Sequence, residues 1–99
     1  MEDPYELSLP EGWTAAADEQ RVAYTSADGA ERVTLRESVL GLALYWFVEL
    51  ETRRDGAGAW VERPLDVGDP FTDWEDAAER TDRLIRNLDR GYCEYAPEA

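Results

Sequence analysis

Polar and apolar residues alternate on either side of Asp28-Gly29 in the run RVAYTSADGAERVTLRE, residues 21–37. Alternation with a period of two is typical of half-buried strands. Asp-Gly between two such strands favours a two-residue type I′ turn, because both turn residues need positive φ. The pattern therefore predicts an antiparallel hairpin with one apolar face. Its expected register pairs Tyr24 with Val33 and Val22 with Leu35.

The run LALYWFVELETRR, residues 42–54, predicts a long strand between Gly41 and the turn DGAG. The spacing of its polar residues Glu49 and Glu51 fits a period of two residues better than one of 3.6, which favours a strand over a helix. The even positions form one apolar face: Leu42, Leu44, Trp46, Val48 and Leu50. The odd positions are apolar in the first half only: Ala43, Tyr45, Phe47, Glu49 and Glu51.

Weaker signals flank these strands. WTAAAD, residues 13–18, is a weak strand candidate because Ala is a poor strand former. AWVER, residues 59–63, returns the chain after the DGAG turn, and Pro64 ends this strand or marks it as an edge. We expect the antiparallel strands within residues 12–64. Residues 1–10 are acidic and contain two prolines, so they form either a loosely held segment or an edge strand.

A helix is expected over residues 73–90. Thr72 and Glu75 have the spacing of a capping box, in which the hydroxyl caps a backbone N–H and the carboxylate reaches back. Acidic residues crowd the first turn and arginines the last, as the helix dipole favours, and Gly91 supplies a stop. One stripe follows the helical period: Trp74, Ala77, Ala78, Thr81, Leu84, Ile85 and Leu88.

Together these elements predict a single α+β domain of 99 residues. Its architecture is an antiparallel four- to five-stranded meander with one C-terminal helix packed on one face. At this length folding buries roughly two-thirds of the chain surface, which is enough for one modest core. The helix stripe is expected to cover the even-numbered face of residues 42–50.

The charge of the chain is strongly unbalanced. It has 23 acidic and 10 basic residues, all of the latter Arg, which gives a formal net charge of −13. Such a surface repels itself at low ionic strength, whereas in molar salt the Debye length falls to roughly 3 Å. The composition therefore predicts halophilic adaptation. GC-biased coding would explain the arginines but not the excess of carboxylates.

Residues 9–90 resemble uncharacterised small acidic β-meander-plus-helix proteins of halophilic archaea. The resemblance is carried by LPEGW near the start, the RVAYTSADGAERVTL hairpin, a Trp-bearing strand and a closing helix. It implies no activity, so it assigns no functional residue.

Composition disfavours two classes of partner. Nucleic-acid affinity relies on Lys and Arg neutralising phosphates and falls steeply with salt, so we expect no nucleic acid. No apolar run approaches the roughly 20 residues that span a bilayer, and the acidic N-terminus has no signal-peptide core. We expect no membrane association and a cytoplasmic location. The single Cys93, which allows no internal disulfide, agrees with a reducing compartment.

Candidate catalytic groups are few. The chain has no His, the commonest general base, and no Lys for a Schiff base, and Cys93 has no His to activate it. Oxygen ligands for a hard cation could gather at the densest carboxylate group. That group comprises Asp66, Asp69, Asp73, Glu75 and Asp76. Several carboxylates fall in any window of so acidic a chain, so we assign no metal, cofactor or catalytic residue, and an enzyme is disfavoured.

The odd face of the long strand carries the functional hypothesis. If the helix covers the even face, Ala43, Tyr45 and Phe47 remain on the other side. Either residues 5–9 fold back over them, or they form an exposed apolar patch rimmed by glutamates, which usually marks a contact surface. The aromatics would also suit base stacking, but the glutamates would repel phosphates.

The sequence thus predicts a small non-enzymatic interaction module. It docks on a protein partner or forms a homodimer through Ala43, Tyr45 and Phe47. The alternative is a ligand- or cation-binding domain, or a small enzyme, that uses carboxylates and aromatics. Saturable binding confined to one concave patch would favour that alternative.

Overall fold

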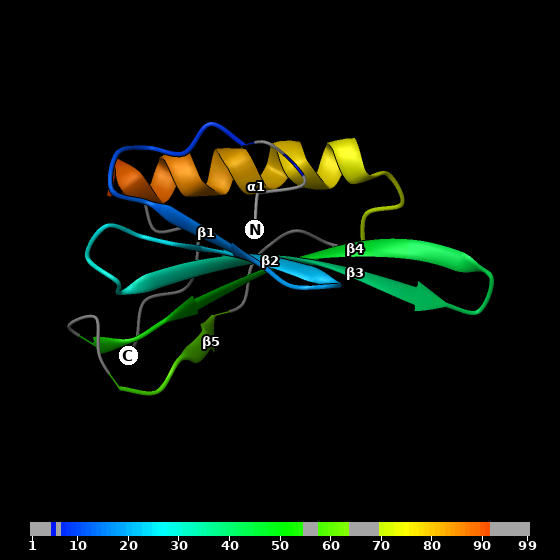
Figure 1. Ribbon diagram of the computed structural model, residues 1–99, viewed down its shortest axis with the longest axis horizontal. Helices are drawn as coiled ribbons and strands as arrows, with labels where there is room; N and C mark the ends of the chain where they lie inside the picture. Colours follow the sequence, from blue (N-terminus) through cyan, green and yellow to red (C-terminus); the bar gives the residue numbers. More distant parts are fainter. Residues whose placement is uncertain (1–4, 6, 55–57, 64–69, 92–99) are drawn as a thin grey trace.

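The computed structural model describes residues 5, 7–54, 58–63 and 70–91. They form one antiparallel sheet in the order β1-β2-β3-β4-β5, followed by one helix, α1. The elements are β1 (Thr14–Ala17), β2 (Arg21–Thr25), β3 (Glu31–Leu40), β4 (Ala43–Thr52), β5 (Val61–Arg63) and α1 (Trp74–Asp89). The helix lies across one face of the sheet (Figure 1). The expected α+β meander with a C-terminal helix is confirmed.

The turn between β2 and β3 is wider than the expected two-residue turn. The Ser26 N–H donates to the Glu31 carbonyl at 2.9 Å, so residues 27–30 form the loop. Ser26 Oγ accepts from the Glu31 N–H at 3.1 Å and donates to Asp28 Oδ1 at 2.7 Å, and these bonds stabilise the wider turn. The loop gains one residue on each side, so the register is unaffected. Tyr24 pairs with Val33 and Val22 with Leu35, as expected.

The hairpin of β3 and β4 is longer than the sequence pattern predicts. Its ladder runs from the pair Glu31 and Thr52 to the pair Leu40 and Ala43. Gly41 and Leu42 form the two-residue turn between them, where Gly41 has φ of +67°. The pattern predicts a strand that ends near Glu37 and another that begins at Leu42. It misses the continuation of β3 because Val39 and Leu40 are adjacent apolar residues without alternation.

The edge of β4 that faces away from β3 is paired in two places. β5 pairs with residues 50–52 of β4. Farther along, Phe71 forms an isolated bridge with Trp46, with both N–H···O distances at 2.9 Å. This bridge holds the chain beside the middle of β4 just before α1 begins.

The hydrophobic core lies between the sheet and α1. The sheet contributes alternating residues from three strands: Val22, Tyr24, Val33, Leu35, Trp46, Val48 and Leu50. The helix contributes Ala77, Ala78, Leu84, Ile85 and Leu88, with Thr81 buried beside them. The predicted helix stripe is therefore confirmed from Ala77 onward. Trp74 is instead exposed, with its ring centroid 6.3 Å from that of Tyr5.

The N-terminal segment lies on the helix side of the sheet. Tyr5, Leu7 and Leu9 pack against the core. Arg86 Nη2 donates to the Ser8 carbonyl at 2.9 Å and holds the segment against α1. Residues 7–10 form no strand, so the edge-strand alternative is wrong for this described part of the segment.

The LPEGW motif forms a tight turn that closes one end of the core. The Trp13 N–H donates to the Pro10 carbonyl at 3.2 Å, and Gly12 has φ of +87°. A Cβ at Gly12 would lie 2.6 Å from the Ala27 Cβ, so the turn needs glycine for space as well as for φ. The buried Trp13 ring donates from Nε1 to Asp89 Oδ1 at 3.3 Å, which ties the turn to the end of α1.

The N-cap of α1 is Asp73, not Thr72 as the capping box predicts. Asp73 has φ of −129° and ψ of 127°, and its Oδ1 accepts from the Glu75 N–H at 2.8 Å. The bridge to Trp46 keeps Phe71 in extended backbone, so the helix begins after it. An Asp N-cap also places a negative charge at the positive end of the helix dipole.

We expect Asp73→Ala to lower the free energy of unfolding by about 1 kcal/mol, through the loss of this cap. Thr72→Ala is the matched control and should cost less than about 0.5 kcal/mol, as an exposed substitution away from the cap. Denaturant unfolding in molar KCl measures both. A larger loss of unfolding free energy for Thr72→Ala than for Asp73→Ala would mean that Thr72 is the N-cap.

Two neighbouring carboxylates near the β2–β3 turn have opposite pKa shifts. Burial raises the pKa of Glu31, and the charge of Asp28 raises it further. The hydrogen bond from Ser26, followed by that from the Ala30 N–H, lowers the pKa of Asp28. A raised pKa means that ionised Glu31 opposes folding at neutral pH and ceases to do so as the pH falls through that pKa. Because the pKa of Asp28 is lowered, its ionised form favours folding at neutral pH, and this contribution is lost as the pH falls through that pKa.

We therefore expect Glu31→Gln to raise Tm at neutral pH and Asp28→Asn to lower it. Each variant removes one negative charge, so net charge is matched between them. Both differences from the native Tm should shrink as the pH falls and the native carboxyls become protonated. Thermal unfolding across this pH range tests the pair, and Tm changes of the same sign would contradict the assignment.

Candidate interaction surface

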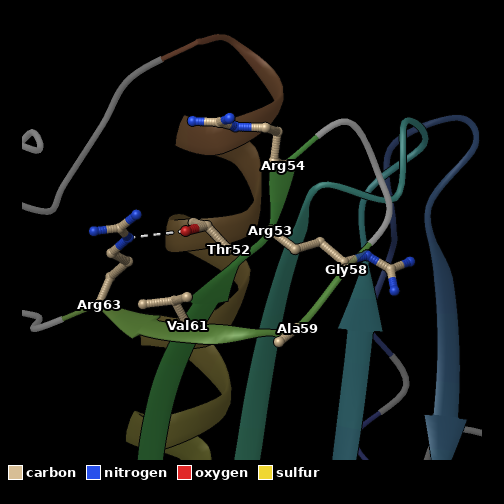
Figure 2. A pocket seen from close by; sticks show the side chains of 7 residues that line it. All are labelled: Thr52, Arg53, Arg54, Gly58, Ala59, Val61 and Arg63. Atoms are coloured by element: carbon tan, nitrogen blue, oxygen red, sulfur yellow. Dashed lines mark hydrogen bonds between the residues drawn. The ribbon is translucent and has the colours of Figure 1, made fainter.

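A hollow of about 410 Å³ lies where β4 meets β5 (Figure 2). Its lining comprises Thr52, Arg53, Arg54, Gly58, Ala59, Val61 and Arg63. Arg63 Nε donates to Thr52 Oγ1 at 2.8 Å, whereas Arg53 and Arg54 point to different sides. The described lining residues offer guanidinium groups and a hydroxyl but no carboxylate or thiol. These residues therefore supply no acid–base pair for catalysis.

The carboxylate group considered as a cation site is only partly described. Asp66 and Asp69 lie outside the described residues, as does Cys93. Asp73 caps α1, and Glu75 lies in its first turn. Within residues 5, 7–54, 58–63 and 70–91, no group of three or more His, Cys, Asp or Glu side chains is placed to hold a metal ion.

The sheet face away from α1, here called the outer face, carries the sequence-predicted contact residues. Ala43, Tyr45 and Phe47 lie on it opposite Leu40, Ser38 and Arg36 of β3. The N-terminal segment packs on the helix side instead. In the described part of that segment, residues 5 and 7–9, the expectation that it folds back over Tyr45 and Phe47 is therefore wrong.

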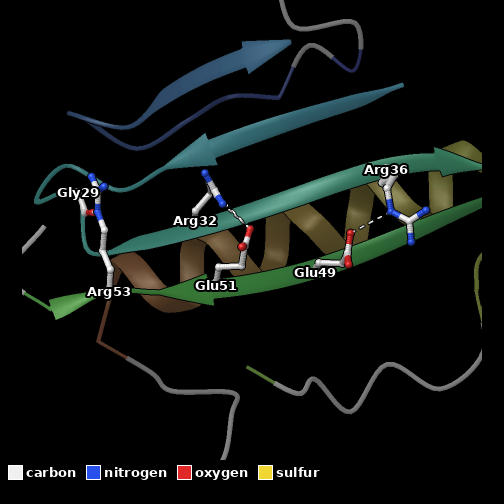
Figure 3. A network of polar contacts seen from close by, with 6 residues as sticks. All are labelled: Gly29, Arg32, Arg36, Glu49, Glu51 and Arg53. Atoms are coloured by element: carbon white, nitrogen blue, oxygen red, sulfur yellow. Dashed lines mark hydrogen bonds and ion pairs between the residues drawn. The ribbon is translucent and has the colours of Figure 1, made fainter. Parts of the chain in front are cut away.

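Arginines cover part of the aromatic surface on the outer face. Tyr45 and Phe47 are half-buried, and Ala43 is exposed. The Arg36 guanidinium carbon lies 4.5 Å from the centroid of the Phe47 ring. Its Nε also contacts Glu49 Oε1 at 3.0 Å (Figure 3). Arg36 thus shields the ring and neutralises the glutamate beside it.

The second glutamate of the expected rim is also paired. Arg32 donates from Nη2 and Nε to Glu51 Oε1 at 2.8 and 3.0 Å (Figure 3). The rim of Glu49 and Glu51 therefore repels negatively charged groups less than the sequence pattern indicates. The pairing follows from the register of β3 with β4, which places Arg32 opposite Glu51.

Trp60 is part of this surface, although the sequence analysis did not single it out. The guanidinium carbons of Arg32 and Arg53 lie 4.3 and 4.2 Å from its ring centroid. Arg53 Nε also donates to the Gly29 carbonyl at 2.8 Å. Only the pairing of β4 with β5 brings these residues together, so no local sequence signal indicates the contact.

The tip of the β3–β4 hairpin projects beyond its neighbours. β2 pairs with β3 as far as Arg36, with one further bond from the Glu37 N–H to the Gln20 carbonyl at 2.8 Å. On the other edge, Phe71 reaches β4 at Trp46. We call residues 38–45 the overhang. Figure 1 shows this end of the hairpin extending past the N-terminal end of α1.

The overhang is apolar and exposed. Its large side chains retain much of their accessible surface: Val39 67%, Leu40 54%, Leu42 108% and Leu44 38%. The expectation that α1 covers Leu42 and Leu44 is therefore wrong, since the helix covers β4 only from Trp46 to Leu50. Val39 and Leu44 form a pair on the helix side, and Leu40 and Ala43 form a pair on the outer face. Both faces of the overhang are thus apolar.

Fold and surface together define a small α+β protein with an apolar hairpin tip and a sheet face of paired arginines and aromatics. Comparison with protein-family models, curated proteins and solved structures found no match. No helix in the described part of the chain is long and apolar enough to cross a membrane.

Proposed function

We propose that this protein is a non-enzymatic interaction module of a salt-rich cytoplasm. It docks on another polypeptide through the overhang and the adjoining outer face at Tyr45 and Phe47. The observation that carries this proposal is the exposure of four large aliphatic side chains at one end of the sheet. Contiguous exposed apolar surface on a small protein usually marks a contact site.

The distribution of charge supports a protein partner. No residue from Ser38 to Val48 is charged, although Asp, Glu and Arg make up 33% of the chain. A nucleic-acid partner would need unpaired cations along this surface to neutralise phosphates. Two arginines of the outer face, Arg36 and Arg32, already pair with Glu49 and Glu51, which leaves the exposed Arg21, opposite Arg36, to contact a phosphate. An apolar polypeptide surface fits this end of the sheet better than a polyanion does.

Molar salt favours the same mode of contact. Screening removes the long-range repulsion between acidic proteins. Kosmotropic ions also strengthen the burial of apolar surface. An acidic protein in such a medium can therefore bind through a neutral apolar patch without a basic partner.

Site-specific photo-cross-linking in the producing cell tests the proposal. Benzoylphenylalanine replaces Ala43 on the exposed overhang or, as the matched control, Thr14 at the opposite edge of the outer face. We expect a discrete polypeptide adduct from position 43 and none from position 14. Adding Tyr45→Ser and Phe47→Ser to the first protein should remove most of the adduct.

Two results would contradict the proposed function. One is the absence of any discrete adduct from position 43. The other is the same set of adducts from both positions, which would indicate random collisions. The mass of a specific adduct shows whether the partner is another protein or a second copy of this chain.

A further inference from the structure

We infer that the partner of the overhang is a second copy of this chain. In the dimer, two overhangs pack with their helix-side faces together about a two-fold axis. Val39 and Leu44 of each copy then face Val39 and Leu44 of the other. This inference rests on the proposed function of the overhang. It names the partner and makes the helix-side face, rather than the outer face at Tyr45 and Phe47, the centre of the contact.

The helix-side rows of β3 and β4 are only partly covered by α1. On β4 the row is apolar throughout: Leu50, Val48 and Trp46 are buried, and Leu44 is exposed. On β3, Val33 and Leu35 are fully buried and Val39 is exposed, with the half-buried Glu37 between Leu35 and Val39, opposite Trp46. The same sheet face is thus left uncovered where α1 ends. A second apolar layer at this position would continue the core.

The absence of charge on the overhang makes a second copy of this chain a suitable partner. The overhang has no charged group, so a strongly charged partner gains no electrostatic complementarity there. Its partner must offer an uncharged apolar surface, and the overhang of a second copy is such a surface. Two chains of net charge −13 also repel each other least when their uncharged ends meet.

Symmetry makes the contact self-complementary. A two-fold interface uses the same patch on both copies, and it is the commonest arrangement of soluble homo-oligomers. A standard interface takes about 20 residues on each side, so the exposed side chains of the overhang cannot form it alone. The contact must extend to neighbouring side chains, among which the exposed Trp74 at the start of α1 is available on the helix side.

Sedimentation velocity of the purified chain in molar KCl tests the inference. We expect the native protein to sediment at twice the mass of one chain. Val39→Ser/Leu44→Ser should raise the dimer Kd at least about a hundredfold, because four apolar side chains per dimer lose their burial. Val61→Ser is the matched control, since it removes an exposed aliphatic side chain from β5 at the distant edge of the sheet, and should leave the dimer intact.

A cysteine cross-link gives an independent measurement if the double variant fails to fold. Val39→Cys in a Cys93→Ser background should form an intermolecular disulfide on mild oxidation, since the two copies of residue 39 lie near the two-fold axis. Val61→Cys in the same background should remain uncross-linked. Circular dichroism of each variant establishes whether it is folded.

Three outcomes would overturn the inference: a native monomer at every concentration in molar KCl, a dimer that the overhang substitutions leave intact, or equal cross-linking from positions 39 and 61. If the purified chain is monomeric but position 43 yields an adduct with a different polypeptide in the cell, the inference fails and the proposed function stands. If the chain is monomeric and position 43 yields no adduct, both fail.

Discussion

Leu50→Ala is expected to lower the free energy of unfolding by about 3 kcal/mol, whereas Leu42→Ala should change it by less than about 0.5 kcal/mol. The two leucines occupy equivalent even positions in the same apolar run. Leu50 is fully buried between β4 and α1, and its removal leaves a cavity in the core. Leu42 lies in the hairpin turn, where its side chain is as exposed as in an unfolded chain.

Denaturant unfolding of dilute protein in molar KCl measures both changes. Dilution matters because a dimer through the overhang would add a concentration-dependent term to the stability of the Leu42 variant. Repeating the experiment at high protein concentration therefore separates the two contributions. Equal losses for both variants in dilute solution would mean that another part of the chain covers Leu42.

Transfer from molar KCl to about 0.1 M salt should destabilise the fold by at least about 2 kcal/mol, or roughly 8–16 °C in Tm. With 23 acidic and 10 basic residues, arginines leave a net charge of −13 that is not neutralised. The observed ion pairs include Arg32 with Glu51 and, on α1, Arg86 with Asp82. Repulsion among the remaining carboxylates grows as the Debye length increases from roughly 3 to 10 Å.

Thermal unfolding across a KCl series tests this expectation. Asp18→Asn/Glu19→Gln is a useful control because both side chains are exposed in the short loop between β1 and β2. It reduces the excess of negative charge without touching the core, so it should raise Tm at low salt and have little effect in molar KCl. A Tm that is independent of salt would refute the electrostatic argument.

Local sequence patterns determined most of the fold. The alternation around Asp28-Gly29 gave the correct β2–β3 register, because widening the turn symmetrically does not shift the pairing. The helical period from Ala77 to Leu88 gave the correct buried stripe, because that stripe is the only apolar face of α1. These features depend on neighbours within one or two elements, which is the range over which sequence periodicity carries information.

Part of the candidate surface could also be predicted. The period of two along β4 correctly assigned Ala43, Tyr45 and Phe47 to the face away from α1. It also gave Glu49 and Glu51 as their neighbours. It could not show that both glutamates pair with arginines, since those arginines lie on β3 and their position depends on the register of the long hairpin.

Only the tertiary structure decided which apolar residues are covered. A helix of 16 residues is roughly 24 Å long, whereas a strand of 10 residues is roughly 33 Å long, so α1 cannot cover all of β4. The bridge between Phe71 and Trp46 places the helix start beside the middle of the strand. The leucines at positions 42 and 44 therefore lie past the helix, although their sequence pattern is that of core residues. Their exposure depends on where a distant segment pairs, and no local pattern contains that information.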